Sequence, residues 1–173
     1  IETYKLGKMK RFILSLLISV LALGAFAQKG KVSSALNYID ANNYIKAKEA
    51  IDAAIVHEKT IAWPKTFYAQ GRLAQAMYES GDDKMRALYE DPLILAYNSY
   101  LKSIELDEKS TTEKLVFLQL PALSNDFLEW AIDEFEAAQY EKSLMAFEKL
   151  IEIQESDLFG GVVDTAVIYN AGL

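Results

Sequence analysis

The chain contains no cysteine and only one histidine among its 173 residues. Without cysteine there are no disulfide bonds, so packing alone must hold the folded core together. Zinc sites take most of their ligands from Cys and His, and the single His57 has no partner for such a site. We therefore expect no metal and no cofactor. We interpret His57 as a residue at a helix C-terminus, where its protonated form interacts well with the helix dipole.

Motifs for nucleotide binding and hydrolysis are also missing. The sequence has no G-x-G-x-x-G, no P-loop, no G-x-S-x-G and no H-E-x-x-H. Basic residues are outnumbered, with 18 Lys and Arg against 25 Asp and Glu, which gives a net charge of −7. Binding to nucleic acid requires clustered Lys and Arg. The composition therefore favours a protein that is not an enzyme and does not bind nucleic acid.

The N-terminal residues have the layout of a secretory signal peptide. A short basic start, Met9-Lys10-Arg11, precedes the uncharged run 12–27, which closes with Ala25-Phe26-Ala27. We predict a signal peptide over residues 9–27 with cleavage after Ala27, and an exported protein that is periplasmic or secreted. Residues 1–8 precede Met9, so we expect them to be non-native upstream sequence. No cysteine follows the run, which excludes lipid attachment there.

The alternative is an uncleaved membrane anchor. A helix of 16 residues spans about 24 Å, which is short of the ~30 Å hydrocarbon core of a bilayer. We therefore favour cleavage, and we expect membrane contact only through an uncleaved segment. The remaining residues 28–173 hold 14 basic and 24 acidic residues, a net charge of −10.

One spacing recurs three times in the remaining chain: a bulky residue, a small residue three positions later and a bulky residue four positions after that. These three residues share one helix face, and the small one allows a neighbouring helix to approach closely. Such recurrence is typical of stacked helical hairpins. The three sets are Tyr44, Ala47 and Ile51; Leu93, Ala96 and Tyr100; and Tyr140, Ser143 and Phe147.

Apolar periodicity and turn residues predict helices throughout this part of the chain. Gly71 costs about 1 kcal/mol in an open helix, so we expect another helix to cross against it, with Phe67 on the same packing face. Ser110-x-x-Glu113 predicts a capping box, and Pro121 predicts a break in the helix that follows. The short pair Val162-Val163 is the best strand candidate and is too short. We expect helices over 32–40, 44–57, 64–79, 92–106, 111 to about 121, 124–138, 140–154 and 165–173.

Several segments resemble tetratricopeptide repeats, the helix–turn–helix units of 34 residues. The resemblance is carried by Phe67-x-x-Gln70-Gly71-x-x-Ala74, by Ala96-x-x-x-Tyr100, by Tyr140-Glu141-Lys142-Ser143-x-x-x-Phe147 and by Tyr169-Asn170-Ala171-Gly172. It implies an all-α, right-handed superhelical array of antiparallel helix pairs over residues 28–173. About three repeats plus the first helix of a fourth are expected. The chain departs from the family by insertions near 80–92 and 110–121 and by lacking the exit prolines, and we expect it to be a piece of a longer protein.

The resemblance also implies a concave groove that binds a protein or peptide. In the second unit the matching positions are Lys65, Tyr68, Arg72 and Gln75, where the two cations would hold a carboxylate. An ordinary solvated face is the alternative. In the third unit the matching positions are mostly apolar, and we favour packing against the inserted helix over ligand contact; they are Asn125, Leu128, Ile132 and Phe135.

Acidic residues gather at three places in the sequence. Asp82-Asp83 and Glu90-Asp91 flank the first insertion, and their spacing does not match a calcium loop. Asp133, Glu134 and Glu136 lie on one predicted helix. We interpret all of them as solvated charge, and we interpret most aromatic residues as core. Trp63 and Trp130 fall in or beside helices, which disfavours a carbohydrate-binding platform.

The sequence thus predicts an exported repeat scaffold that binds a protein or peptide and catalyses no reaction. Three alternatives stay open: a non-catalytic adaptor domain of a larger secreted or outer-membrane-associated enzyme, a component of glycan uptake, and a membrane-tethered scaffold.

Overall fold

A computed structural model describes residues 28–158 and 160–172, and in this part of the chain all regular secondary structure is helical. The prediction of an all-α fold is confirmed there. The predicted upstream residues 1–8 and signal peptide 9–27 lie outside the described residues, as do Phe159 and Leu173. None of the described helices has the length and apolar character needed to cross a membrane. After the helical residues 28–40 come α2 (Tyr44–Ile55), α3 (Pro64–Glu79), α4 (Asp83–Arg86), α5 (Pro92–Glu105), α6 (Thr111–Phe117), α7 (Leu120–Glu136), α8 (Tyr140–Glu155) and α9 (Thr165–Ala171).

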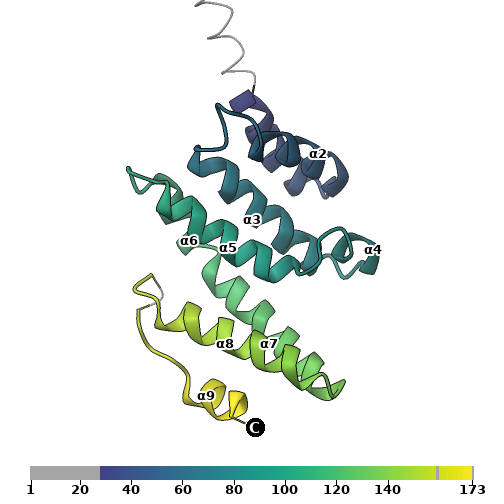
Figure 1. Cartoon of the computed structure of the whole chain (residues 1–173), viewed down its shortest axis with the longest axis vertical. Coiled ribbons are helices and arrows are strands. Elements are labelled where there is room, and N and C mark those ends of the chain that lie inside the picture. Colours follow the sequence, from purple (N-terminus) through teal and green to yellow (C-terminus); the bar gives the residue numbers. More distant parts are fainter. Residues whose placement is uncertain (1–27, 159, 173) are drawn as a thin grey trace, which may run out of the picture.

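The helices follow one another along the long axis of the molecule (Figure 1). Residues 28–40 and α2 lie at one end, α3 and α5 in the middle, and α7, α8 and α9 at the other end. The short helices α4 and α6 occupy the two regions that the sequence marks as insertions. Contacts run from each helix to its neighbours in this order, with α3 packed on both α2 and α5.

Helices α3 and α5 form an antiparallel pair that closes around a glycine. The Ser103 hydroxyl near the end of α5 donates to the Pro64 carbonyl at the start of α3, at 3.0 Å. At the crossing point, a Cβ added to Gly71 would lie 2.6 Å from two ring carbons of Tyr100 and 3.1 Å from the Ala96 carbonyl oxygen. Only glycine permits this separation, because real Cβ contacts almost never fall below 3.0 Å.

Helices α7 and α8 form a second antiparallel pair. The buried Ser143 in the first turn of α8 donates its hydroxyl to the Ala131 carbonyl of α7, at 2.8 Å. The turn between them places Ala138 at φ 57°, and the amide of Gln139 donates back to the Glu134 carbonyl at 2.8 Å. This is a Schellman turn, in which the left-handed position usually belongs to glycine.

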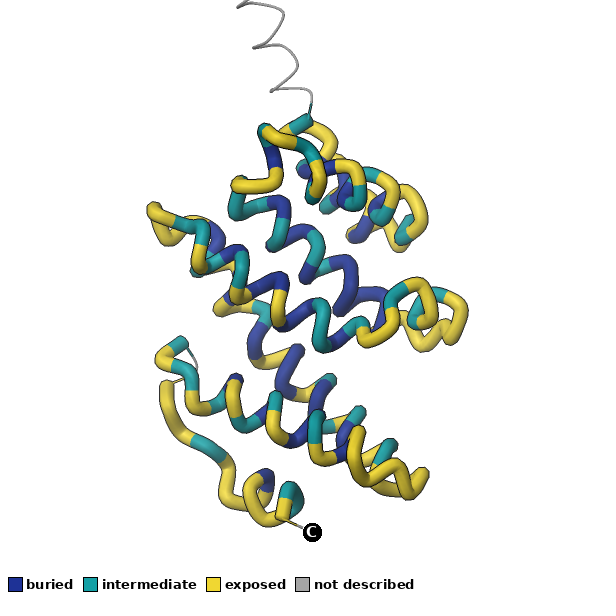
Figure 2. Tube along the Cα trace, viewed as in Figure 1, coloured by how far each residue is buried: buried dark blue, intermediate teal, exposed yellow. Residues whose placement is uncertain are grey.

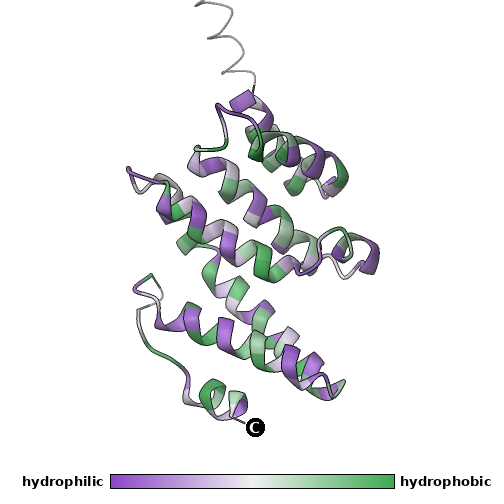
Figure 3. Cartoon of the chain, in the orientation of Figure 1, coloured by the Kyte–Doolittle hydropathy of each residue, from purple (hydrophilic) through white to green (hydrophobic). Residues whose placement is uncertain are grey.

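Helix α3 belongs to two hydrophobic clusters at once. Its Leu73 and Met77 pack with residues 28–40 and α2, whereas its Tyr68 and Ala74 pack with the cluster of α5, α7 and α8. Figure 2 shows this helix buried along most of its length, and Figure 3 shows that apolar and polar residues alternate along each helix. A helix that is covered on two sides has little face left for solvent.

The predicted capping box at Ser110 is wrong. Ser110 adopts φ 51° and its side chain makes no capping hydrogen bond. Asp107 caps α6 instead: its carboxylate accepts from the amides of Thr112 and Glu113 and from the Thr111 hydroxyl. Partial desolvation opposes ionisation, but these hydrogen bonds prevail and lower the pKa of Asp107 well below its usual range.

The chain also breaks earlier than Pro121. Helix α6 ends at Phe117, and α7 begins at Leu120, so that Pro121 stands in the first turn of the new helix. Proline is well suited to that position because the first amides of a helix have no intrahelical partner. The expected start near Ser124 is therefore corrected to Leu120.

Candidate functional site

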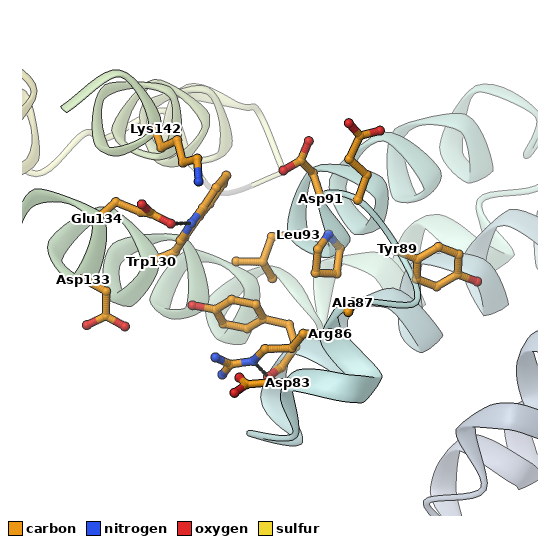
Figure 4. Close-up of a pocket in the computed structure, with 13 residues that line it drawn as sticks. Asp83, Arg86, Ala87, Tyr89, Asp91, Leu93, Trp130, Asp133, Glu134 and Lys142 are labelled. Carbon is orange, nitrogen blue, oxygen red and sulfur yellow. Dashed lines mark hydrogen bonds between the residues drawn. The ribbon is translucent and has the colours of Figure 1, made fainter. Parts of the chain in front are cut away.

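The first insertion folds against the second helix pair and encloses a pocket of about 410 Å³. Its lining comes from the end of α3, from residues 83–93, from α7 and from the first turn of α8 (Figure 4). This volume lies within the roughly 300–1,000 Å³ range of small-ligand pockets. The pocket therefore depends on tertiary packing between segments that are far apart in sequence.

The floor of the pocket is apolar and aromatic. Tyr78 and Leu93 are buried, and Trp130 of α7 is half-buried, with its ring 6.0 Å from that of Phe127. The indole Nε1 of Trp130 donates to the Glu134 carboxylate at 3.0 Å. This hydrogen bond and the ring contact fix the orientation of the indole toward the pocket, as Figure 4 shows.

The rim carries five carboxylates. Glu134 is engaged by Trp130, whereas the other four side chains are exposed and have no hydrogen-bond or ion-pair partner in the part of the chain that the structure describes. The four are Asp83, Glu90, Asp91 and Asp133. The sequence predicts only that these acids belong to three separate groups of solvated charge. Their convergence around Trp130 was missed because the fold of the insertion has no local sequence signal.

Two cations face these carboxylates. Arg86 is built into the wall: its Nε donates to the Tyr78 carbonyl at 2.8 Å, and its guanidinium carbon lies 4.4 Å from the centroid of the Tyr78 ring. Lys142 extends from α8 toward Trp130 and is exposed (Figure 4). The pocket residues therefore carry five negative charges against two positive charges.

The pKa of Tyr78 reflects these surroundings. Its pKa is raised to about 12, mainly by burial and in smaller part by the carboxylates of Glu129, Asp133 and Asp126, while the charge of Arg86 opposes the shift. Nearby negative charge raises the pKa of a phenol because it disfavours the phenolate. Tyr78 is thus a neutral wall residue at physiological pH, in a region of negative potential.

The four predicted groove positions do not form an exposed row. Tyr68 and Gln75 are buried, and Lys65 and Arg72 are half-buried. Lys65 Nζ lies 3.4 Å from the Ser33 hydroxyl, and Arg72 Nη1 donates to Gln119 Oε1 at 2.7 Å. These four positions therefore do not form an open face, because α3 is covered by helices on both sides.

Gln75 joins three helices. It accepts from the Tyr100 hydroxyl of α5 at 2.8 Å, and its amide nitrogen donates to Glu79 at 3.0 Å and to Asp126 of α7 at 2.8 Å. The pKa of Asp126 is raised to about 6, mainly by burial and in smaller part by the charges of Glu79 and Glu129, while the Gln75 hydrogen bond opposes the shift. This cluster links the first helix pair to the second.

The apolar positions expected in the third unit are divided. Leu128 packs against the larger hydrophobic cluster, whereas Ile132 and Phe135 are 42% and 43% exposed. Both line a smaller pocket of about 270 Å³ beside Asn170 of α9. Their expected packing against the inserted helix α6 is therefore corrected to a position facing α9. The fourth position, Asn125, is exposed.

The residues predicted to pack are mostly buried. The exceptions are Phe67, which is half-buried, and Tyr140, which is 62% exposed and meets the Phe135 ring edge-on at 5.5 Å between centroids. His57 accepts from the Lys59 amide through Nδ1 at 3.2 Å, in the turn after α2. In the described ranges no group of three or more His, Cys, Asp or Glu is arranged to hold a metal ion. Among the residues predicted to pack, the buried ones are Ala47, Ile51, Gly71, Ala96, Tyr100, Ser143 and Phe147.

Comparisons with known proteins identify no relative. The chain matches no protein-family model, and no curated protein or solved structure is significantly similar to it. The residues of the chain and their geometry are therefore the basis on which its function is inferred.

Proposed function

We propose that this chain is an exported scaffold, built like a tetratricopeptide-repeat array, that binds a peptide or an extended segment of a partner protein. One observation carries the proposal: the pocket around Trp130 has an apolar floor and four rim carboxylates without partners in the described part of the chain. A pocket of mixed character with a few convergent polar groups is the default binding site of a protein.

The array architecture is supported by the order of helix contacts. The pairs α3–α5 and α7–α8 are antiparallel, and contacts between α2 and α3, between α5 and α7, and between α8 and α9 link successive pairs. We propose that these pairs follow the right-handed superhelical arrangement of the repeat family, with α4 and α6 as insertions. Close contacts at Gly71 and Ser143 supply the small residues that such stacking requires.

Binding in this proposal is passive recognition. Trp130 is held by Glu134 and Phe127, and Arg86 is held by Tyr78, so these parts of the wall are ordered before a partner arrives. A preformed site loses little conformational entropy on docking. We place binding at this pocket rather than at the row from Lys65 to Gln75, because Tyr68 and Gln75 already contact neighbouring helices.

Export is proposed from residues 9–27 alone, and the mass of the mature protein tests it.

Binding is tested by panning a random dodecapeptide library, displayed on phage, against the purified protein and against an unrelated helical protein. We expect sequences that are enriched on this chain only and that bind it as synthetic peptides. Equal enrichment on both proteins, or none, contradicts the proposed function.

A further inference from the structure

The class of side chain that fits the pocket follows from its charge. Among the pocket residues, the carboxylates of Asp83, Asp91 and Asp133 are exposed and make no hydrogen bond or ion pair within the described ranges. Arg86 and Lys142 offset only part of this charge, since the pocket residues carry five negative charges against two positive charges, and the guanidinium of Arg86 is stacked on Tyr78 and hydrogen-bonded to a carbonyl rather than ion-paired with a carboxylate. An incoming cation meets favourable potential here, whereas an incoming carboxylate meets repulsion.

The floor adds a second requirement, which is an apolar stem. Buried Leu93 and half-buried Trp130 lie between the rim acid Asp91 and the acids of α7 (Figure 4). Lysine and arginine have long aliphatic stems that lie along apolar surface and carry the charge at the tip. A small metal ion or an inorganic cation would leave this floor in contact with water.

The wall already shows one contact of this kind. Arg86 lies over the Tyr78 ring, with 4.4 Å between the guanidinium carbon and the ring centroid. Cation–π contacts are strongest with tryptophan, and the indole of Trp130 lines the same cavity. The Glu134 hydrogen bond to Nε1 holds that indole in place beside the Asp133 and Glu134 carboxylates.

We infer that the pocket receives the side chain of a lysine or arginine from the partner peptide. The aliphatic stem lies against Leu93 and Trp130, and the cationic tip lies among the carboxylates of the rim. This inference rests on the proposed function and specifies its substrate class: an extended segment with a basic residue at the anchor position.

The test uses three blocked pentapeptides, Gly-Ser-Xaa-Ser-Gly, in which the central residue is lysine, glutamate or norleucine. Binding is followed by the NMR signal of the Trp130 indole N–H, assigned by comparison with Trp63→Phe. We expect the lysine peptide to shift this signal and the other two to leave it unchanged. The double variant Asp133→Asn/Glu134→Gln should bind the lysine peptide about fivefold more weakly, as expected for two partly exposed charges.

The matched control is Glu49→Gln, an exposed residue of α2 outside the pocket, and it should bind like the unmodified chain. Equal shifts with norleucine or glutamate overturn the inference, as does a lysine effect that the double variant does not weaken. If panning yields specific peptides but the lysine peptide leaves Trp130 unchanged, the inference fails while the proposed function stands. If panning also fails, both fall.

Discussion

A Cβ atom on Gly71 would lie 2.6 Å from the ring of Tyr100, which makes this contact the closest constraint on the α3–α5 crossing. The neighbouring atoms have little freedom to move away, since Tyr100 is buried and its hydroxyl donates to Gln75. The helix crossing thus depends on the absence of one methyl group.

We expect Gly71→Ala to lower the free energy of unfolding by about 1–3 kcal/mol, because overpacking outweighs the better helix propensity of alanine. Gly71→Leu should unfold the chain. The matched control is Gly30→Ala, also in a helix but with nothing within 4 Å of the added Cβ, which should be neutral or stabilising. Urea unfolding measures the free energy of unfolding of both alanine variants. Equal stability of the two would count against the close packing of α5 on Gly71.

At the start of α6, Asp107→Asn should reduce stability by about 1 kcal/mol, the typical value of an N-terminal cap. Ser110→Ala should have little effect, since the Ser110 hydroxyl makes no capping bond. Because the pKa of Asp107 is lowered in the folded state, its contribution is complete above the unfolded value of 3.8 and is lost as pH falls toward the folded pKa. Thermal melts at pH 7 and pH 3 check both statements; a larger loss from Ser110→Ala would reverse the assignment.

Asp126 should give the opposite pH dependence. Its folded pKa of about 6 exceeds the unfolded 3.8, so the folded state binds the proton more tightly, and stability rises as pH falls from 7.5 through 6. Asp126→Asn should remove this rise. Asp157→Asn, at an exposed carboxylate, is the matched control. Melting temperature is measured from pH 7.5 to 5, and identical profiles for Asp126→Asn and the unmodified chain would exclude the effect.

The turn between α7 and α8 offers a stabilising substitution. Ala138 holds a left-handed conformation, which costs a residue with a Cβ roughly 1 kcal/mol, and glycine relieves that cost. Ala138→Gly should therefore raise the free energy of unfolding by about 1 kcal/mol. Ala137→Gly, one residue earlier at φ −78°, should lower it. A destabilising Ala138→Gly would show that this turn is not the Schellman motif described.

Much of the fold follows from local sequence signals. Pro64 and Pro92 open α3 and α5 as expected, and α8 begins at Tyr140, directly after Gln139 in the predicted turn. Gly71 predicted a crossing helix, because glycine destabilises the interior of a helix and is expected there only where a neighbouring helix packs closely. The Ser110 prediction failed because Asp107, three residues earlier, already accepts from the first amides of α6, while Ser110 adopts the αL conformation.

The candidate site was much less predictable. Periodicity places Tyr68 and Gln75 within one turn of Gly71, and it does not reveal that α3 has helices on both sides. The rim acids are separated by some fifty residues, from Asp83 to Asp133, and only the packing of the insertion on α7 brings them to one pocket. Runs of acidic residues usually face solvent, so the acidic residues in the sequence do not by themselves identify the pocket around Trp130.

The most direct test of the account is hydrogen exchange, measured with and without a peptide selected in the panning experiment. We predict that the bound peptide slows exchange in residues 78–93 and 127–142, the segments that supply the pocket. Protection confined to residues 28–55 or to α9, with the pocket segments unchanged, would contradict the claim that the partner binds beside Trp130.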